Sequence, residues 1–253
     1  AGRYGKYKIE LIYDKVLHRF VYDARTLYTG VGTGNLEISN AIQTNLQSST
    51  STTDVANRLN DFSTSASTVD LQLFRKTGKA NINVMALAPF NFRLELSREN
   101  RTGTRPFSGT FGFGNSINLP EPIDYDTTQM KFIAQYAKNP WYVNATYYLS
   151  IFENHTGTLR FDNPFRVTDS TAANAYTFSF QGGPSKGLID LYPNNTYHNV
   201  SLTGAYKALP LKSTISLTGS WGWMRQNDDL VPYTTNTAMA TGAVTGVAGE
   251  LVP

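Results

Sequence analysis

Several stretches of the chain alternate apolar and polar side chains with a period of two. In the clearest stretch, one face of an extended segment carries a set of apolar side chains, namely Trp141, Val143, Ala145, Tyr147, Leu149 and Ile151. Residues 90–97 repeat the pattern, with Phe90, Phe92, Leu94 and Leu96 on the apolar face. Alternate side chains of a strand point to opposite faces, and about ten tilted residues cross the hydrocarbon core of a bilayer. The pattern therefore predicts an all-β fold, a transmembrane antiparallel up-and-down β-barrel.

The same alternation predicts about eight strands, arranged as four hairpins within one barrel region that covers residues 1–253. The hairpins are expected near residues 5–28, 69–100, 128–152 and 196–224. The first would pair residues 5–13 with residues 19–28 through a tight turn near residues 14–18. The other three would turn at Ala88-Pro89, at residues 138–140 and at Leu209-Pro210, where the missing N–H of proline is harmless.

Long connections rich in Ser, Thr, Asn, Gly and Pro separate the hairpins. They cover residues 29–68, 101–127, 153–195 and 225–253, and residues 53–62 within the first are compatible with a short helix. Long structureless loops in alternation with tight turns are unusual in a compact soluble domain. Outer-membrane barrels, in contrast, have short periplasmic turns and long extracellular loops. The four connections are therefore predicted to be extracellular, which places the chain in a bacterial outer membrane.

Aromatic residues support this polarity. A set of them is expected beside the short turns, as an interfacial girdle: Tyr13, Phe20, Phe90, Tyr136, Trp141 and Tyr206. Trp221 and Trp223 are expected near the opposite interface. This topology would start and end the chain on the outside, and residues 249–253 do not resemble the aromatic closing strand of a bacterial barrel. We therefore expect the chain to be part of a larger barrel.

Composition narrows the alternatives. The charged fraction of 16% is below the roughly 25% of a typical soluble domain. The sequence has no run of 18 apolar residues, so it predicts no transmembrane helix. A secreted β-sandwich or adhesin would share this composition and remains an alternative. The net charge of +3 and the absence of a Lys/Arg run argue against a nucleic-acid partner, and the absence of cysteine excludes covalent haem attachment through C-x-x-C-H.

Candidate chemistry along the chain is sparse. Residues 30–34 (GVGTG) lack the strand–helix context of a phosphate loop, and His18, His155 and His198 lack metal-ligand spacing. The Asp pairs at 124/126 and 228/229 have the ligand type that calcium prefers, but solvated loop carboxylates explain them better. No nucleophile or paired-carboxylate arrangement stands out. We therefore predict no catalytic, cofactor-binding or metal-binding residues, and no enzyme activity.

The expected lumen lining is more informative. In the third hairpin, Lys131, Gln135, Asn144, Thr146 and Ser150 would face inward. In the fourth hairpin, a second set would do so: Ser201, Thr203, Thr214, Ser216 and Thr218. Such a neutral, hydroxyl-rich lining does not form a ring of one charge and so does not indicate ion selectivity. It is compatible with hydrogen bonds to a protein inside the barrel.

Five sequence segments, which we call phrases, are more specific than the apolar–polar alternation that any barrel shows. They are residues 23–32 (DARTLYTGVG), 119–125 (LPEPIDY), 161–166 (FDNPFR), 191–206 (LYPNNTYHNVSLTGAY) and 222–234 (GWMRQNDDLVPYT). In their order and spacing, from about residue 4 to residue 234, they resemble the decahaem-associated outer-membrane proteins, the barrels of the MtrB/PioB type. The chain resembles the N-terminal part of such barrels.

This resemblance implies a large porin-like sheath that houses a periplasmic decahaem or other multihaem c-type cytochrome in its lumen. Electrons would then cross the outer membrane, to or from extracellular partners, which include an extracellular multihaem cytochrome. The sheath itself would bind no cofactor covalently, and haem c would belong to the partner. The residues that we select for partner contact are Phe161, Asn163, Pro164, Phe165 and Arg166, in the longest connection. The alternative function is a passive or gated solute-transport porin.

Overall fold

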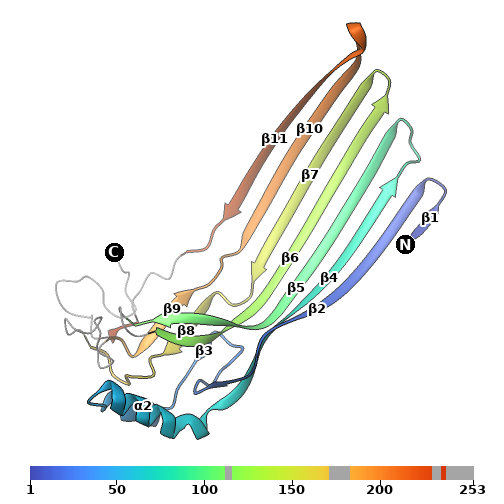
Figure 1. The fold of residues 1–253 in the computed structure, drawn as a ribbon. Coiled ribbons are helices and arrows are strands. Elements are labelled where there is room, and N and C mark those ends of the chain that lie inside the picture. The colour runs from blue at the N-terminus through green and yellow to red at the C-terminus, as the bar shows by residue number, and fades with distance from the viewer. Residues whose placement is uncertain (112–115, 171–182, 230–234, 238–253) are drawn as a thin grey trace, which may run out of the picture.

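The computed structural model describes residues 1–111, 116–170, 183–229 and 235–237. A long antiparallel sheet makes up most of the molecule, and a smaller group of helices and short strands lies at one end of it (Figure 1). No helix among the described residues has both the length and the apolar character needed to cross a membrane.

The sheet contains eight strands in the order β1-β2-β4-β5-β6-β7-β10-β11. Their bounds are Gly2–Tyr4, Tyr7–Thr26, Ser67–Val84, Phe90–Thr110, Ser116–Lys138, Trp141–Asn154, Asn195–Leu209 and Ser213–Gln226, respectively. Short turns join the strands at one end of the sheet, and long segments connect β2 to β4 and β7 to β10 at the other end (Figure 1). Within the described residues, β11 and the greater part of β2 each have one unpaired edge, so the sheet is open.

The hairpins β4–β5, β6–β7 and β10–β11 confirm three of the four predicted hairpins. The prediction for the first hairpin was wrong, because residues 14–18 form no turn. They lie inside the 20-residue strand β2, where Asp14 pairs with Thr77 and His18 with Leu73. This stretch contains no Gly, Pro or Asn that would break a strand, and β4 is long enough to pair along it. The real turn lies at Gly5–Lys6, so Tyr13 and Phe20 do not lie beside a turn.

The prediction of a loop at residues 101–127 was also wrong. Strands β5 and β6 continue through this region and pair without interruption as far as Thr110 and Ser116. Pro106 and Pro120 lie opposite each other, beyond the points where β4 and β7 stop pairing with this hairpin. Proline is tolerated in a strand when its side of the ladder has no partner, so these prolines do not interrupt the hairpin.

Gly103 marks the point where the β5–β6 hairpin leaves the main sheet. It is the last residue of β5 that pairs with β4, and its φ of +138° is unfavourable for other residues. A Cβ atom at this position would lie 2.1 Å from the carbonyl oxygen of Gln72. Only glycine permits this close approach of the two backbones, after which β5 and β6 extend beyond the sheet as a separate ribbon.

The short turns are staggered along the sheet. Tyr7, the first residue of β2, pairs with Val84 of β4, which in turn pairs with Phe92 of β5. Strand β5 begins two residues before this position, at Phe90. Phe90 in turn lies opposite Tyr136, and β6 continues two residues further to Lys138, which pairs with Trp141. Each hairpin thus begins about two residues beyond the preceding one. Strands that tilt relative to a barrel axis require such a stagger.

We call the group at the other end of the sheet the cap. It contains β3 (Asn35–Leu36), α1 (Asn40–Gln47), α2 (Thr52–Asp61), η1 (Phe62–Ser65), β8 (Thr158–Asp162) and β9 (Lys186–Asp190). Strands β3, β8 and β9 form a separate three-stranded sheet. Helix α2 confirms the short helix predicted at residues 53–62, and its N-cap Ser51 accepts a hydrogen bond from the Asp54 N–H at 3.1 Å.

Candidate functional site: the polar face of the sheet

The two faces of the main sheet differ in chemistry. Residues that lie opposite each other on paired strands share a face, so the register assigns every side chain to one side. One row across the sheet is apolar: Ile9, Ile82, Leu94, Phe132, Tyr147, Val200 and Trp221. The next row points to the other face and is mostly polar: Lys8, Asn83, Arg93, Ile133, Thr146, Ser201 and Ser220. The alternation seen in the sequence therefore produces one apolar and one polar face.

The apolar face is open to its surroundings. Leu217 is 80% exposed, and Leu202 and Trp141 are each 55% exposed. Aromatic pairs border this face at the short turns, where Trp141 packs on Tyr206 with ring centroids 4.7 Å apart and Phe90 packs on Tyr136 at 5.2 Å. Trp223 borders the opposite end, while Trp221 lies two residues further inside. An exposed apolar surface of this extent suits contact with lipid.

The polar face is hollowed. A cavity of about 540 Å³ opens between β2, β4, β5 and β6, and its polar lining includes Asp14, Arg75, Lys79 and Glu99. A smaller cavity of about 210 Å³ lies nearer the short turns and is lined by Lys8, Glu10, Asn81, Arg93 and Glu95, among others. Both cavities lie against side chains of the polar face, so this is the face that can surround a lumen.

We call the polar-face side chains of β2, β4, β5 and β6 between the short turns and Gly103 the charged zone. It contains six basic residues (Lys8, Arg75, Lys79, Arg93, Arg101 and Lys131) and four acidic ones (Glu10, Asp14, Glu95 and Glu99). Arg101 bonds to Glu99 at 2.6 Å, and Arg93 lies 3.7 Å from Glu95. These pairs are partly exposed, so each contributes only about 0–1 kcal/mol and remains available to a partner. The prediction of a neutral lining missed this zone because it considered only the third and fourth hairpins.

The polar-face side chains of β7, β10 and β11 form what we call the neutral zone. The predicted inward residues Asn144, Thr146, Ser150, Ser201, Thr203, Ser216 and Thr218 all share this face, and Thr214 has the same parity in β11. Lys131 and Gln135 face the same side from β6. Hydrogen bonds link neighbouring strands here, for example Thr203 to Thr218 at 3.0 Å.

The cap packs against the same face of the sheet, beyond the charged zone. The polar-face side of the extended β5–β6 ribbon becomes apolar there, with Ile117 and Leu119 buried. Phe161 of β8 packs on this ribbon, and its ring lies 5.4 Å from that of Phe111. The apolar core of the cap consists of Tyr28, Leu36, Ile38, Phe111, Ile117, Leu119, Leu159, Phe161 and Leu191. The cap therefore lies at the mouth of any lumen that the polar face surrounds.

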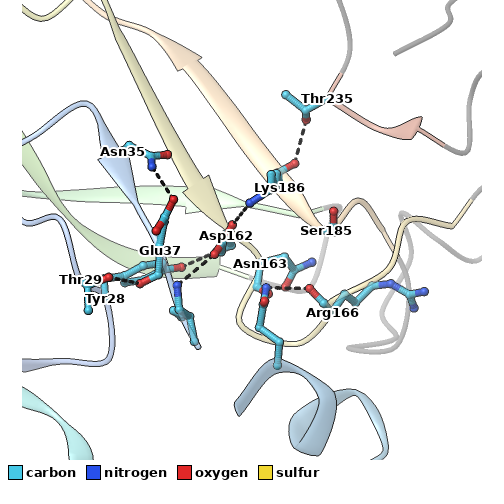
Figure 2. A network of polar contacts seen from close by, with 12 residues as sticks. Tyr28, Thr29, Asn35, Glu37, Asp162, Asn163, Arg166, Ser185, Lys186 and Thr235 are labelled. Carbon is cyan, nitrogen blue, oxygen red and sulfur yellow. Dashed lines mark hydrogen bonds and ion pairs between the residues drawn. The ribbon is translucent and has the colours of Figure 1, made fainter. Parts of the chain in front are cut away.

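Figure 2 shows how the predicted partner-contact segment is held inside the cap. The carboxylate of Asp162 forms an ion pair with Lys186 and accepts the Ile38 N–H at 3.0 Å. The hydroxyl of Tyr28 donates to the Asp162 carbonyl at 2.7 Å. Burial, with a smaller effect from the nearby Asp162 carboxylate, raises the pKa of Tyr28 above its ordinary value. The segment thus connects β3, β8 and β9.

The side chains selected for partner contact serve the cap itself. Phe161, Asn163, Pro164 and Arg166 are buried, and only Phe165 is partly exposed. The amide of Gln43 donates to the carbonyls of both Asn163 and Arg166, at 2.7 and 2.8 Å, and so joins α1 to this segment. Their contact with a partner stays a prediction. The Asn-Pro pair, which favours a turn, was the sequence signal for this structural role.

An ion pair between a half-buried arginine and a buried glutamate lies between the charged zone and the cap. Arg105 binds Glu121 through two contacts of 2.5 and 3.0 Å, and Glu121 is 1% exposed. A cavity of about 670 Å³ adjoins this pair, and its lining includes Tyr192, Asp190 and Asp228. Two parallel hydrogen bonds fix the guanidinium relative to the carboxylate, so the pair holds the base of the ribbon in one geometry.

The other candidate residues are dispersed. His198 lies on the apolar face, with Nδ1 2.8 Å from the Tyr147 hydroxyl and its ring stacked on Trp223, whereas His155 lies 3.3 Å from Asp126. Residues 30–34 form a turn before β3 in which Thr33 donates to the Gly30 carbonyl. Among the described residues, no three His, Cys, Asp or Glu side chains gather as a metal site. The predicted connection at 225–253 and the phrase at 222–234 lie partly outside the described residues.

Comparison with known proteins agrees with this architecture. A family model of outer-membrane β-barrel porins, MtrB/PioB, matches residues 1–250. The outer membrane protein MtrB of Shewanella baltica (strain OS185) is 28% identical over 206 residues, which are 81% of this chain and 27% of that relative. The chain therefore spans about a quarter of the length of the relative. Because the family match covers nearly the entire chain, this protein belongs to the MtrB/PioB family of outer-membrane β-barrel porins.

Proposed function

We propose that the polar face lines the lumen of a sheath that houses a multihaem c-type cytochrome and so enables electron transfer across the outer membrane. The observation that carries this proposal is the mixed chemistry of the polar face. Basic and acidic side chains both occur throughout the charged zone, and hydroxyl, amide and tyrosine side chains cover the neutral zone. Such a surface can form many directional contacts with a fixed protein, whereas an ion-selective pore usually presents a ring of one charge.

The open sheet supports a wide lumen. Within the part of the chain that the structure describes, β11 and most of β2 each have one unpaired edge with a row of backbone N–H and C=O groups. Each such group costs several kcal/mol if it is left unsatisfied in lipid. We infer that further strands pair with both edges and close a barrel larger than eight strands. Lumen diameter grows with strand number, so such a barrel has room for a folded protein.

The sheath and its partner would divide the chemistry between them. This part of the wall contains no cysteine, in line with a division in which covalent haem would belong to the cytochrome and the wall would contribute position and insulation. The apolar face would keep the polar cytochrome away from lipid, and the charged zone would fix its depth and rotation. The wall would have no enzymatic role. We retain an extracellular multihaem cytochrome as a second partner, which would contact the cap near Phe165.

Native purification tests this proposal. The full-length protein is extracted from outer membranes in detergent, and c-type haem is quantified per barrel by absorbance. We expect haem on a separate co-purifying polypeptide, in fixed ratio to the barrel, and little ion conductance in a planar bilayer. A haem-free barrel that conducts ions would contradict the sheath and favour the solute-transport porin.

A variant pair makes the test specific to the polar face. K79Q/R93Q/K131Q removes three positive charges from the charged zone, and we expect it to lower the amount of haem retained per folded barrel at moderate salt. The control, K138Q/K207Q/K212Q, removes the same charge near the short turns. Equal haem retention in both variants would show that the charged zone does not hold the cytochrome.

A further inference from the structure

Two lysines face each other on the apolar side of the sheet. Lys15 of β2 and Lys76 of β4 are register partners, and they share their face with Tyr13 and Leu17 rather than with the charged zone. Both side chains are exposed, and neither forms an ion pair with a described residue. Like charges directly opposite each other on paired strands are destabilising, so an anion bound between the two ammonium groups would stabilise the pair.

More positive charge surrounds this pair. Asn100 lies opposite Lys76, so Arg98, two residues away on β5, occupies the diagonally adjacent position on the same face. Its side chain is 68% exposed, and its contact with Asp126 at 3.2 Å leaves other guanidinium N–H groups free for a second acceptor. Arg19 follows on β2 and shares this face opposite Gln72. Lys15 also covers the apolar surface, with Nζ 5.3 Å from the centre of the Phe74 ring.

The height of the pair places it at the edge of the lipid-facing band. Lys15 lies eight residues beyond the start of β2 at Tyr7, and Lys76 lies eight residues from the end of β4 at Val84. At about 3.3 Å per residue and a tilt of about 40°, eight residues rise roughly 20 Å, close to the ~25 Å height of the apolar band of outer-membrane barrels. The long connections lie beyond this point, so the pair belongs to the outer leaflet.

We propose that Lys15 and Lys76, flanked by Arg98 and Arg19, form a binding site for the phosphate groups of an anionic lipid headgroup in the outer leaflet. The lysine stems lie along the apolar face while their ammonium groups reach the headgroup level. Phosphate oxygens accept hydrogen bonds from both ammonium groups and cancel their mutual repulsion. The site depends on the outer-membrane location and not on a cytochrome in the lumen, so either proposal can fail without the other.

The test uses the full-length protein in detergent micelles that contain a lipid A-type glycolipid with two phosphates, or the same glycolipid after dephosphorylation. Native mass spectrometry counts the copies retained. We expect retention of the phosphorylated form to exceed that of the dephosphorylated form, and K15Q/K76Q to lower its affinity about thirtyfold, since each lysine near an anionic surface contributes about fivefold. K138Q/K212Q removes two charges near the short turns and should retain the glycolipid as the unmodified protein does.

A second measurement separates binding from folding. In vesicles of phosphatidylcholine alone, K15Q/K76Q should be at least as resistant to urea as the unmodified protein, because it lacks the repulsion between the lysines. Addition of the phosphorylated glycolipid should then stabilise only the unmodified protein. The proposal is overturned if the unmodified protein retains both glycolipid forms equally. It is also overturned if K15Q/K76Q binds the phosphorylated form as the unmodified protein does.

Discussion

The main sheet and the cap differ in where they place their large apolar side chains. In the sheet, large apolar side chains such as Leu202 and Leu217 point outward and stay exposed, while charged side chains line the hollowed face. In the cap, apolar side chains such as Leu36 and Leu159 are fully buried, as in a soluble protein. The difference shows that the solvent of each region, lipid or water, decides which side chains face outward.

The largest effect is expected when a buried side chain of the cap is truncated, which tests whether the sheet is stable independently of the cap. Phe161→Ala would empty the space between β8 and the β5–β6 ribbon, and truncation of a buried phenylalanine costs about 3–5 kcal/mol. We expect rapid proteolysis within the cap, while the barrel still inserts and keeps its heat-modifiable mobility in gels. Phe165→Ala, at a partly exposed neighbour, is the control and should leave the cap resistant. Loss of insertion in Phe161→Ala would mean that the sheet depends on the cap.

The two faces of the sheet can be compared with one substitution at one depth. Val200 and Ser201 are neighbours on β10 but point to the apolar and polar faces, respectively. Val200→Arg should lower the free energy of unfolding in lipid vesicles by about 2–4 kcal/mol, whereas Ser201→Arg should change it by less than about 1 kcal/mol. Urea titration of both variants measures the difference. Similar losses would mean that the register does not distinguish a lipid face from a lumen face.

The sequence was sufficient to predict the parts of the wall where periodicity and turn residues agree. Three hairpins, both faces of β5 and β7, and the aromatic pairs at the short turns follow from local patterns. It failed where local signals were weak or conflicting. Strand β2 has charged residues on both faces at residues 14–19, which resembled a turn, and Pro106, Pro120 and Pro122 resembled loop residues.

The cap shows why the rest could not be predicted. Its core joins residues from four separate stretches of sequence, and the hydrogen bonds of Gln43 span about 120 positions. Helix α1 is mostly polar and carries no side-chain cap at Ser39, so it has little local signal. The contacts that Phe161 and Asn163 make within the chain could not be predicted, because contacts between distant segments leave no periodic pattern in the sequence. The charged zone was missed for a related reason, since the β2–β4 pairing that assembles it joins distant segments.

Alkaline pH should produce the smallest effect, and it should be confined to the cap. Tyr28 is buried and its hydroxyl donates a hydrogen bond to the Asp162 carbonyl, and its folded-state pKa is raised above the ordinary value of about 10. A raised pKa means that its contribution is fully present below about pH 10 and is lost as the pH rises further. Local opening of the cap, measured as the amide exchange rate relative to the intrinsic rate at each pH, should therefore increase above about pH 10, with little change in β7 and β10.

Tyr28→Phe provides the control for this pH dependence. Removal of the hydroxyl leaves the Asp162 carbonyl without one partner, so the cap should be weaker by about 1 kcal/mol at neutral pH. The variant has no phenol to ionise at this position, so its exchange should no longer accelerate specifically in the cap. If the unmodified protein and Tyr28→Phe loosen equally with alkali, ionisation elsewhere is responsible. The cap would then respond to pH as the sheet does, and Tyr28 would not distinguish the two regions.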